Sequence, residues 1–418
     1  MITFLSCRFG KLYYNDISKL HYQNIVYPIQ RHYDLIHSMQ ALKDLFLLDP
    51  EVTFLNHGSF GATPRPVFEI YQAWQRELEK QPVEFLFRRE SDLLANARQN
   101  LASYINCEAD DIVFFPNTTT ALNMVARSLD LQPGDEILTT DHEYGALYRT
   151  WRFLCSKTGA QVIQTSIPLP IPPDDELIES FWTSVTARTR VIFISHITSE
   201  TALILPIKEI CRRARLAGIL TIIDAAHVIG QIPIDLTDLD PDFYASNCHK
   251  WLCAPKGSAF LYSRKEVQSI LEPLVVSWGY EAEQPRASSF IDYHEWQGTR
   301  DISAFLSVPA AIEFQQDHDW DSVRQQCHSI AVETRNRINA LTGIPAISPP
   351  DRFSQMFSSL LPEIDIDQLK LDLYQQYKIE VPILRWNTRP LIRVSFQVYN
   401  DRDDANKLIE ALELLLPA

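Results

Sequence analysis

The sequence predicts an α/β protein with a mostly parallel sheet whose two faces are covered by helices. Short, continuously apolar runs such as Val191–Ile194 alternate with amphipathic segments such as 207–216, the pattern of strands buried on both faces. Polar residues follow the ends of several of these runs, where ligands bind on such sheets. From about residue 310 the composition becomes more charged, with long helical patterns and short strands, which predicts a smaller α+β domain.

The composition excludes several classes of protein. The chain has 418 residues, 46% of them hydrophobic, a formal charge of −15 and a pI near 5.2, which argues against nucleic-acid binding. It contains no run of eighteen apolar residues, so we expect no membrane span. Its seven cysteines lack paired metal-ligand spacing, which favours reduced thiols in a cytoplasmic protein and predicts no metal site.

We expect four segments along the chain. Residues 1–38 are rich in Tyr and His without a clear period, and we expect a poorly packed N-terminal extension arising from a mistaken start codon, not a secretory signal. Residues 39–65 should pack with the small domain, 66–310 should form the large domain, and 311–418 the small C-terminal domain.

The elements are predicted from apolar periodicity and from turn residues. Strands are expected at 52–55, 111–115, 136–140, 162–167, 191–194, 219–223, 242–246 and 391–400, with short strands within 344–367. Helices are expected at 39–49, 66–80, 174–185, 207–216, 303–314, 321–341, 367–377 and 403–415, with a further one starting near Thr118.

A hydroxyl-rich turn follows the second of these strands. The run 111–115 stops at Pro116, Asn117–Thr120 follow, and a helical period begins at Leu122. Strand, polar turn and helix start is an arrangement in which backbone N–H groups and the helix dipole converge on an anion. A plain N-cap is the alternative, because Thr caps any helix well.

Lys250 is the residue around which the chain is organised. A lysine that forms a Schiff base with a pyridine-ring cofactor needs an acid that keeps the ring nitrogen protonated. Asp224 ends the strand 219–223 and stands 26 residues before Lys250, with room for one further strand between them. Both can therefore lie at the carboxyl edge of one sheet.

Two further sites carry polar residues in special positions. Asn56 and His57 lie in a glycine-containing loop, where backbone can approach a ligand closely. Arg393 lies inside an otherwise apolar strand, where an unpaired guanidinium is costly. It needs an anion, either a buried carboxylate of the protein or the α-carboxylate of a substrate.

Several motifs together resemble a known family. Ile222–His227 followed by Ser246-x-x-His249–Lys250 resembles the class V aminotransferases, pyridoxal-phosphate enzymes of fold type I. Phe54–Gly61 and His196–Pro206 are most similar to the isopenicillin-N-epimerase-like branch, and the resemblance covers roughly residues 40–416. It implies a sheet of the seven-stranded type in the large domain.

The resemblance also implies roles for individual residues. Lys250 would form the Schiff base with pyridoxal 5′-phosphate, and Asp224 would contact its ring nitrogen. The cofactor phosphate would be bound by Thr118 and Thr119, together with Asn117. His142 would stack on the face of the cofactor ring, with Tyr144 as the second choice for this role. Ser199, Thr198 or His227 would contact the ring oxygen, where cysteine desulfurases have Asn, and His249 the phosphate or ring face. Structural roles are the alternative for both of these histidines. Arg393 would bind the substrate carboxylate, with Asn56 and His57 bordering the pocket. Thr299 would reach the cofactor of a second subunit, which implies a homodimer with shared active sites.

The reaction expected is α-proton abstraction from an amino acid or its derivative by Lys250. Epimerisation or racemisation is the first hypothesis. A carbon–sulfur β-lyase and an aminotransferase are alternatives, and a cofactor-free regulatory binding protein is a hypothesis of a different class. The segment 374–393, where a desulfurase thiol would precede the carboxylate arginine, contains no cysteine.

Overall fold

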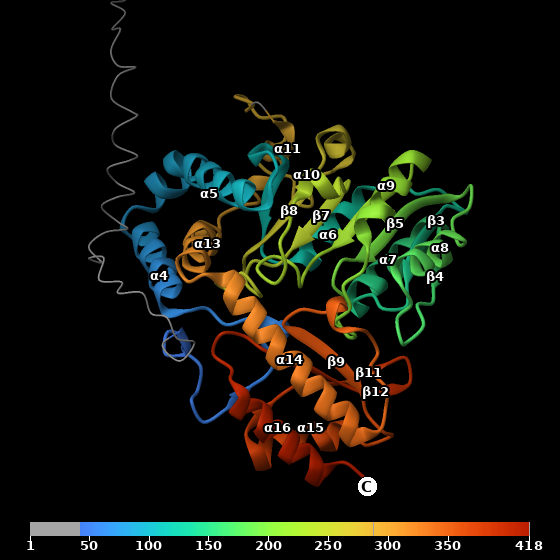
Figure 1. Ribbon diagram of the computed structural model, residues 1–418. Helices are drawn as coiled ribbons and strands as arrows, with labels where there is room; N and C mark the ends of the chain where they lie inside the picture. The colour runs from blue at the N-terminus through green and yellow to red at the C-terminus, as the bar shows by residue number, and fades with distance from the viewer. Residues whose placement is uncertain (1–41, 287, 418) are drawn as a thin grey trace, which may run out of the picture. The chain divides into compact units, whose positions relative to one another are not determined.

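The computed structural model describes residues 42–286 and 288–417, which belong to one compact unit. The expectations for residues 1–38 lie outside the described residues. Figure 1 shows a large sheet with helices around it and a smaller sheet covered by the long helix α14 (Trp320–Thr342). The predicted α/β class is confirmed.

The large sheet has seven strands in the order β2-β8-β7-β6-β5-β3-β4. All pairings are parallel except those of β8, which runs antiparallel to β2 and β7. The strands are β2 (Ile112–Phe115), β3 (Glu136–Thr140), β4 (Gln161–Thr165), β5 (Thr189–Ser195), β6 (Leu220–Asp224), β7 (Phe243–Ser246) and β8 (Ala259–Ser263).

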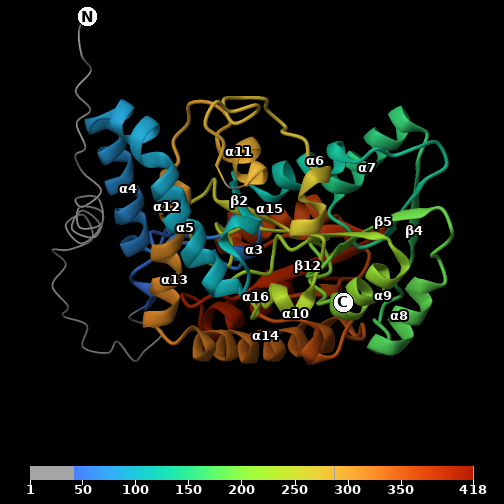
Figure 2. The ribbon, with the colours of Figure 1, turned by 90° about the horizontal axis from the view of Figure 1, so that it is seen from above.

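Alternate residues of one strand enter two separate hydrophobic cores, as expected for a sheet covered on both faces. Ile192 and Ile194 pack in the larger core, while Val191 and Phe193 pack in the smaller one. The smaller core includes α6 (Thr118–Ser128) and α7 (Gly145–Thr158). The larger core includes α5 (Glu90–Ile105), α8 (Asp174–Trp182) and α9 (Ile207–Ala217), and in Figure 2 α8 and α9 lie across β5 from α6 and α7.

The C-terminal part contains an antiparallel three-stranded sheet of order β11-β12-β9. Its strands are β9 (Met356–Leu360), β11 (Ile383–Trp386) and β12 (Arg389–Ser395), and α14 packs on β9. Two helices, α15 (Ile366–Tyr377) and α16 (Arg402–Leu415), complete this part. The parallel pair β1 (Thr53–Phe54) and β10 (Ile379–Glu380) ties the N-terminal segment to it.

The remaining elements are short or connect these layers. They are α3 (His57–Phe60), α4 (Arg65–Lys80), the π-helix η1 (Glu84–Arg89), η2 (Ala109–Asp111), α10 (Leu236–Leu239), η3 (Lys265–Ile270), α11 (Ser289–Glu295), α12 (Ser303–Leu306), α13 (Val308–Asp317) and η4 (Pro350–Arg352). None of the helices in residues 42–286 and 288–417 is long and apolar enough to span a bilayer.

Three sequence predictions differ from the structure. The helix expected at 303–314 is divided into α12 and α13 at Ser307, because Pro309 supplies no N–H to continue the first helix. The helix expected at 39–49 stops before Phe46, which pairs with Pro64 in a β-bridge. The strand expected at 391–400 ends at Ser395 in β12. The division into domains, with its boundary near residue 310, stays a prediction.

Candidate active site

Five parallel strands of the large sheet bring most of the predicted site residues to one edge. This follows from topology, because the carboxyl ends of β2, β3, β5, β6 and β7 point the same way. In the order of the strands across the sheet, the edge carries Asn117 and Thr118 after β2, His249 and Lys250 after β7, Asp224 and His227 at and after β6, Ser199 after β5, and His142 after β3.

Lys250 and Asp224 form the buried centre of this edge. The Lys250 Nζ lies 3.2 Å from the Nε2 of His227. Burial lowers the pKa of Lys250, Arg393 lowers it further, and Asp224 opposes both. Burial likewise raises the pKa of Asp224, although its Oδ1 accepts a hydrogen bond from the Ala226 N–H at 3.0 Å and Lys250 lowers that pKa. The site therefore favours a neutral amine facing a shielded carboxyl group.

The threonine loop has the geometry of an anion site. Asn117 caps α6, its Oδ1 accepting from the Thr120 N–H at 2.8 Å. The Thr118 N–H donates to Asn247 Oδ1 at 2.9 Å, while the Thr118 hydroxyl is buried and has no hydrogen-bond partner in the described protein. Thr119 follows at the half-buried next position. A buried hydroxyl left unpaired at a helix start points to a missing anionic ligand.

Arg393 is buried and lacks a carboxylate partner within ion-pair distance among the residues that the structure describes. Its Nη1 donates to the Ser199 carbonyl at 2.5 Å and its Nη2 to the Ser59 hydroxyl at 3.0 Å. Its Nε is buried without a partner. Ser59 in turn donates to the Oδ1 of Asn56 at 2.5 Å, so Asn56 acts on this arginine through a hydroxyl.

His57 has both ring nitrogens bound to the protein. It is fully buried, and its Nε2 lies 3.0 Å from the Lys250 carbonyl oxygen while its Nδ1 lies 2.8 Å from the Tyr399 hydroxyl. A carbonyl oxygen only accepts, so Nε2 carries the proton. Burial lowers the pKa of His57 to about 3, so the ring is neutral. In this structure His57 holds the backbone of Lys250, and its contact with a substrate stays a prediction.

His142 has both ring nitrogens bound to the protein. Nε2 lies 2.9 Å from the Ile167 carbonyl oxygen and Nδ1 lies 2.8 Å from the Thr201 hydroxyl, while Trp386 stacks on the ring at 4.5 Å. The Thr201 hydroxyl also lies 2.8 Å from the Thr198 hydroxyl, so Thr198 belongs to the same hydrogen-bond network. Neither nitrogen of His142 is available to transfer a proton, and only its second ring face is left for a ligand.

The remaining predicted residues differ in placement. The Ser199 hydroxyl lies 3.4 Å from Arg393 Nη1, at the carboxylate side of the site. The Nδ1 of His249 donates to the Ser258 carbonyl at 2.9 Å, which leaves its Nε2 as an acceptor. Thr299 is exposed. Tyr144 is 43% exposed at the start of α7.

Sequence reasoning missed several residues that shape the site. Ser59 holds Arg393, Asn247 holds the Thr118 N–H, Trp251 contacts His227, and Glu143 is a buried acid beside Ser195. Each of them directly follows or closely neighbours a predicted residue in the chain. Their nearness in sequence to predicted residues was the only sequence signal that they belong to the site. Their roles become visible only from their partners in the folded protein.

Comparison with known proteins agrees with this geometry. The family described as "Aminotransferase class-V" matches residues 63–408, and the chain belongs to this family. The chain is accordingly a pyridoxal-phosphate-dependent enzyme of fold type I. These findings confirm the predicted family, fold and cofactor.

Individual relatives cover nearly the whole chain. An isopenicillin N epimerase of Amycolatopsis lactamdurans is 36% identical over 383 residues, covering 88% of this chain and 96% of that protein. A probable chloroplastic L-cysteine desulfhydrase of Arabidopsis thaliana is 30% identical, covering 93% and 88%. The solved structure of a cysteine desulfurase from Thermococcus onnurineus NA1 has a TM-score of 0.78 at 21% identity, covering 90% and 97%, which shows a shared fold.

The residues at the sheet edge fit pyridoxal phosphate. The unpaired Thr118 hydroxyl suits a phosphate oxygen, and the shielded Asp224 carboxyl suits a ring nitrogen. The neutral amine of Lys250 suits a Schiff base. None of these three groups is used up by a competing ion pair within residues 42–286 and 288–417.

Proposed function

We propose that this enzyme epimerises or racemises an amino acid or an amino-acid derivative, with Lys250 as the general base at the α-carbon. The observation that carries the proposal is a buried amine in the same site as a buried arginine that lacks a carboxylate partner in the described chain. An α-carboxylate bound by Arg393 would bring the α-carbon toward the Lys250 amine.

Bound pyridoxal phosphate supplies the electron sink that makes an α-C–H bond acidic. The chain's own groups then have separate tasks. Asp224 stabilises a protonated ring nitrogen, and Thr118 with Thr119 and Asn117 binds the phosphate at the start of α6. Arg393, held by Ser59 and Ser199, orients the substrate carboxylate. Lys250, whose pKa burial lowers to about 7, accepts the α-proton in its neutral form.

The epimerase is the first choice because an isopenicillin N epimerase is 36% identical to this chain. A carbon–sulfur lyase is the second choice, since relatives named as L-cysteine desulfhydrases are 28–30% identical over most of the chain. A persulfide mechanism is disfavoured. Cys253, three residues after Lys250, lies against His57, and burial raises its pKa to about 12. Cys248, two residues before Lys250, is buried as well, and burial raises its pKa too.

We also propose a cytoplasmic homodimer with shared sites. The exposed position of Thr299 supports it, because this threonine is free to reach the phosphate site of a second copy. Large exposed side chains, among them Phe87 at 86% and Trp278 at 85%, provide apolar area for such contact.

The test is exchange of the α-proton in D₂O. Purified protein with added cofactor is incubated with a panel of amino acids and short peptides bearing a free α-amino acid end. Loss of the α-proton signal is followed by ¹H NMR, configuration by chiral chromatography, and pyruvate in the same samples. We expect exchange with inversion and no net breakdown, and a loss of about 10²–10⁴-fold in Lys250→Ala.

Other results would change the assignment. Pyruvate release from cysteine-like substrates without inversion would make the lyase the function. Absence of exchange with every substrate tried, in protein that binds the cofactor, would contradict α-proton chemistry by Lys250.

A further inference from the structure

The residue directly after Lys250 makes a contact that the site as described does not use. Trp251 is fully buried, and its indole Nε1 donates to the Nδ1 of His227 at 3.4 Å. On the other side of the ring, His227 Nε2 lies 3.2 Å from Lys250 Nζ. The three side chains form a line from the apolar core to the amine.

The direction of this line follows from chemistry. A tryptophan indole N–H only donates, so the Nδ1 of His227 must accept. Burial is the main cause that lowers the pKa of His227 well below its ordinary value, so the ring is neutral. A neutral imidazole carries one proton, and with Nδ1 accepting that proton is on Nε2.

The partner of an Nε2–H group must accept. An ammonium group has three donors and no acceptor, whereas a neutral amine has a lone pair. We propose that Trp251 is a positioning residue that fixes His227 as the Nε2–H tautomer, so that His227 donates to Lys250 and holds its amine in the unprotonated form. This inference rests on the proposed function, in which Lys250 must be neutral to accept the α-proton.

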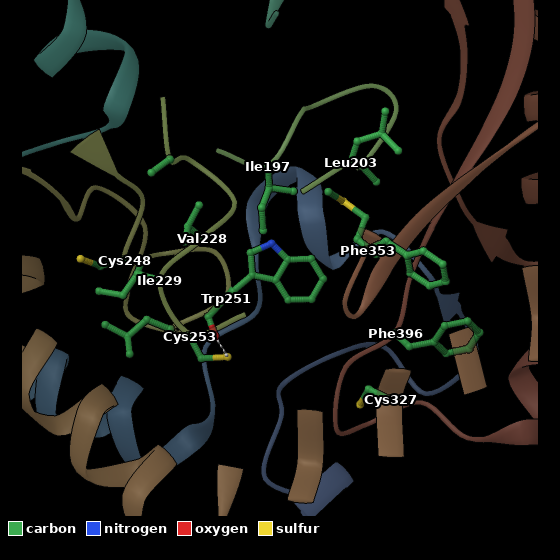
Figure 3. Packing of buried hydrophobic residues seen from close by; sticks show 14 of the residues in the cluster. Ile197, Leu203, Val228, Ile229, Cys248, Trp251, Cys253, Cys327, Phe353 and Phe396 are labelled. Carbon is green, nitrogen blue, oxygen red and sulfur yellow. Dashed lines mark hydrogen bonds between the residues drawn. The ribbon is translucent and has the colours of Figure 1, made fainter. Parts of the chain in front are cut away.

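The packing holds Trp251 in place. In Figure 3 its indole lies in the apolar cluster with Ile197, Val228 and Ile229. Its carbonyl accepts from Gln315 Nε2 at 2.8 Å. Gly230 approaches this backbone so closely that a Cβ there would lie 2.3 Å from the Trp251 oxygen, and its φ of +85° also favours glycine. The Trp251 backbone is therefore fixed by these contacts, and its indole cannot leave His227 without disturbing the core.

The other charged groups around the amine act in both directions. Arg393 also disfavours the ammonium form, while the Asp224 carboxylate favours it. Because the Asp224 carboxylate favours the protonated form of Lys250, a further interaction is needed that favours the neutral amine. The hydrogen bond that His227 donates to the Lys250 amine supplies this interaction.

The test uses cofactor-free protein, so that it does not depend on the reaction. Selective ¹⁵N labelling of histidine reports which ring nitrogen of His227 carries the proton, with His227→Gln used to assign its signals. The rate of Lys250 acetylation by acetic anhydride, followed against pH by mass spectrometry, reports the neutral fraction of the amine. Both are compared between the wild type and Trp251→Phe, which keeps an aromatic ring but loses the donor.

The matched control is Trp320→Phe. Trp320 is also buried, and its indole nitrogen has no hydrogen-bond partner in the described protein, so the same change removes no such contact. We expect an Nε2–H ring in the wild type, appearance of the Nδ1–H tautomer in Trp251→Phe, and acetylation of Lys250 about tenfold slower at neutral pH, equivalent to one pH unit. Trp320→Phe should leave both unchanged.

Two results would overturn the inference. They are an Nδ1–H ring in the wild type, which decides the matter even if Trp251→Phe fails to fold, and an unchanged tautomer and acetylation profile in folded Trp251→Phe. If the tautomer and acetylation results are as expected but no substrate exchanges its α-proton, the proposed function fails and the hydrogen-bond assignment stands.

Discussion

Two buried histidines follow the strands on either side of β5, at the same edge of the sheet, yet the protein uses their nitrogens in opposite ways. His142, after β3, binds Ile167 and Thr201 and points no nitrogen at Lys250. His227, after β6, points its Nε2 at the lysine amine. Burial lowers the pKa of both.

The difference shows that burial alone does not define a catalytic histidine. The partners of the two nitrogens decide whether a ring can affect proton transfer, and those partners come from distant parts of the chain. The ring of His142 is a fixed flat surface, with Trp386 covering one face. The ring of His227 connects the buried indole of Trp251 to the amine of Lys250 through its two nitrogens. Replacing each by Phe should therefore produce different defects.

The largest effect is expected for His227→Phe. Removing the donor lets the Lys250 amine take up a proton, so we expect the rate of α-proton exchange at neutral pH to fall about 100-fold, within the usual range for acid–base groups. The pH at which the rate is half-maximal should move upward, because the amine then loses its proton only at higher pH. A pH–rate profile measures both, and an unshifted profile would contradict the link.

His142→Phe should instead affect stability. The Ile167 carbonyl and the Thr201 hydroxyl each lose a buried partner, and an unsatisfied buried group costs about 1–3 kcal/mol. We expect the free energy of unfolding of the cofactor-free protein to fall by about 2 kcal/mol in urea titrations. The pH–rate profile should keep its shape. A shifted profile would show that a nitrogen of His142 does take part in proton transfer.

Glu143, the residue after His142, is a buried acid whose ionisation should affect stability and not the reaction. It accepts hydrogen bonds from Ser195 at 2.6 Å and Thr140 at 2.7 Å, and burial raises its pKa from 4.5 to about 7, which the Asp224 carboxylate reinforces. A raised pKa in the folded state means that the stability it contributes is present below pH 4.5 and is lost as the pH rises toward about 7.

Glu143→Gln removes this titration while keeping a neutral side chain of the same shape. We expect the wild-type free energy of unfolding to fall by up to about 1.4 kcal/mol per pH unit across that window relative to the variant. Urea titrations of the cofactor-free proteins at several pH values measure the difference. Parallel curves for the two proteins would mean that Glu143 ionises normally.

The sequence sufficed for the fold and for residues whose local pattern carries chemistry. The strand ends, the Thr118 turn, and the pair of Asp224 and Lys250 are all visible as short-range patterns, and the sheet topology explains why they converge. The sequence did not predict the helix α5 or the strand β8.

The orientation of side chains was beyond the sequence. His57 and Asn56 are adjacent and both polar, but the first faces Tyr399 and the second acts on Arg393 through Ser59. Their directions depend on residues more than 300 positions away, which no periodic pattern reports. The hydrogen-bond partners of the ring nitrogens of His142 and His227 lie between 23 and 59 positions away, which is also beyond any local pattern.

The smallest effect is expected at the other end of the edge, for Thr118→Val. The buried Thr118 hydroxyl has no partner in the cofactor-free protein, whereas its N–H stays bound to Asn247 in either variant. Removing the hydroxyl should therefore raise the stability of the cofactor-free protein by about 1 kcal/mol, since an unpaired buried group is costly. It should also weaken cofactor binding about tenfold, since a hydrogen bond to a charged phosphate is lost. A gain in the stability of the cofactor-free protein together with a loss of cofactor affinity is expected only if the hydroxyl binds a ligand. Urea titrations and cofactor titrations followed by absorbance measure them, and a loss of stability in Thr118→Val would show that the hydroxyl serves the fold.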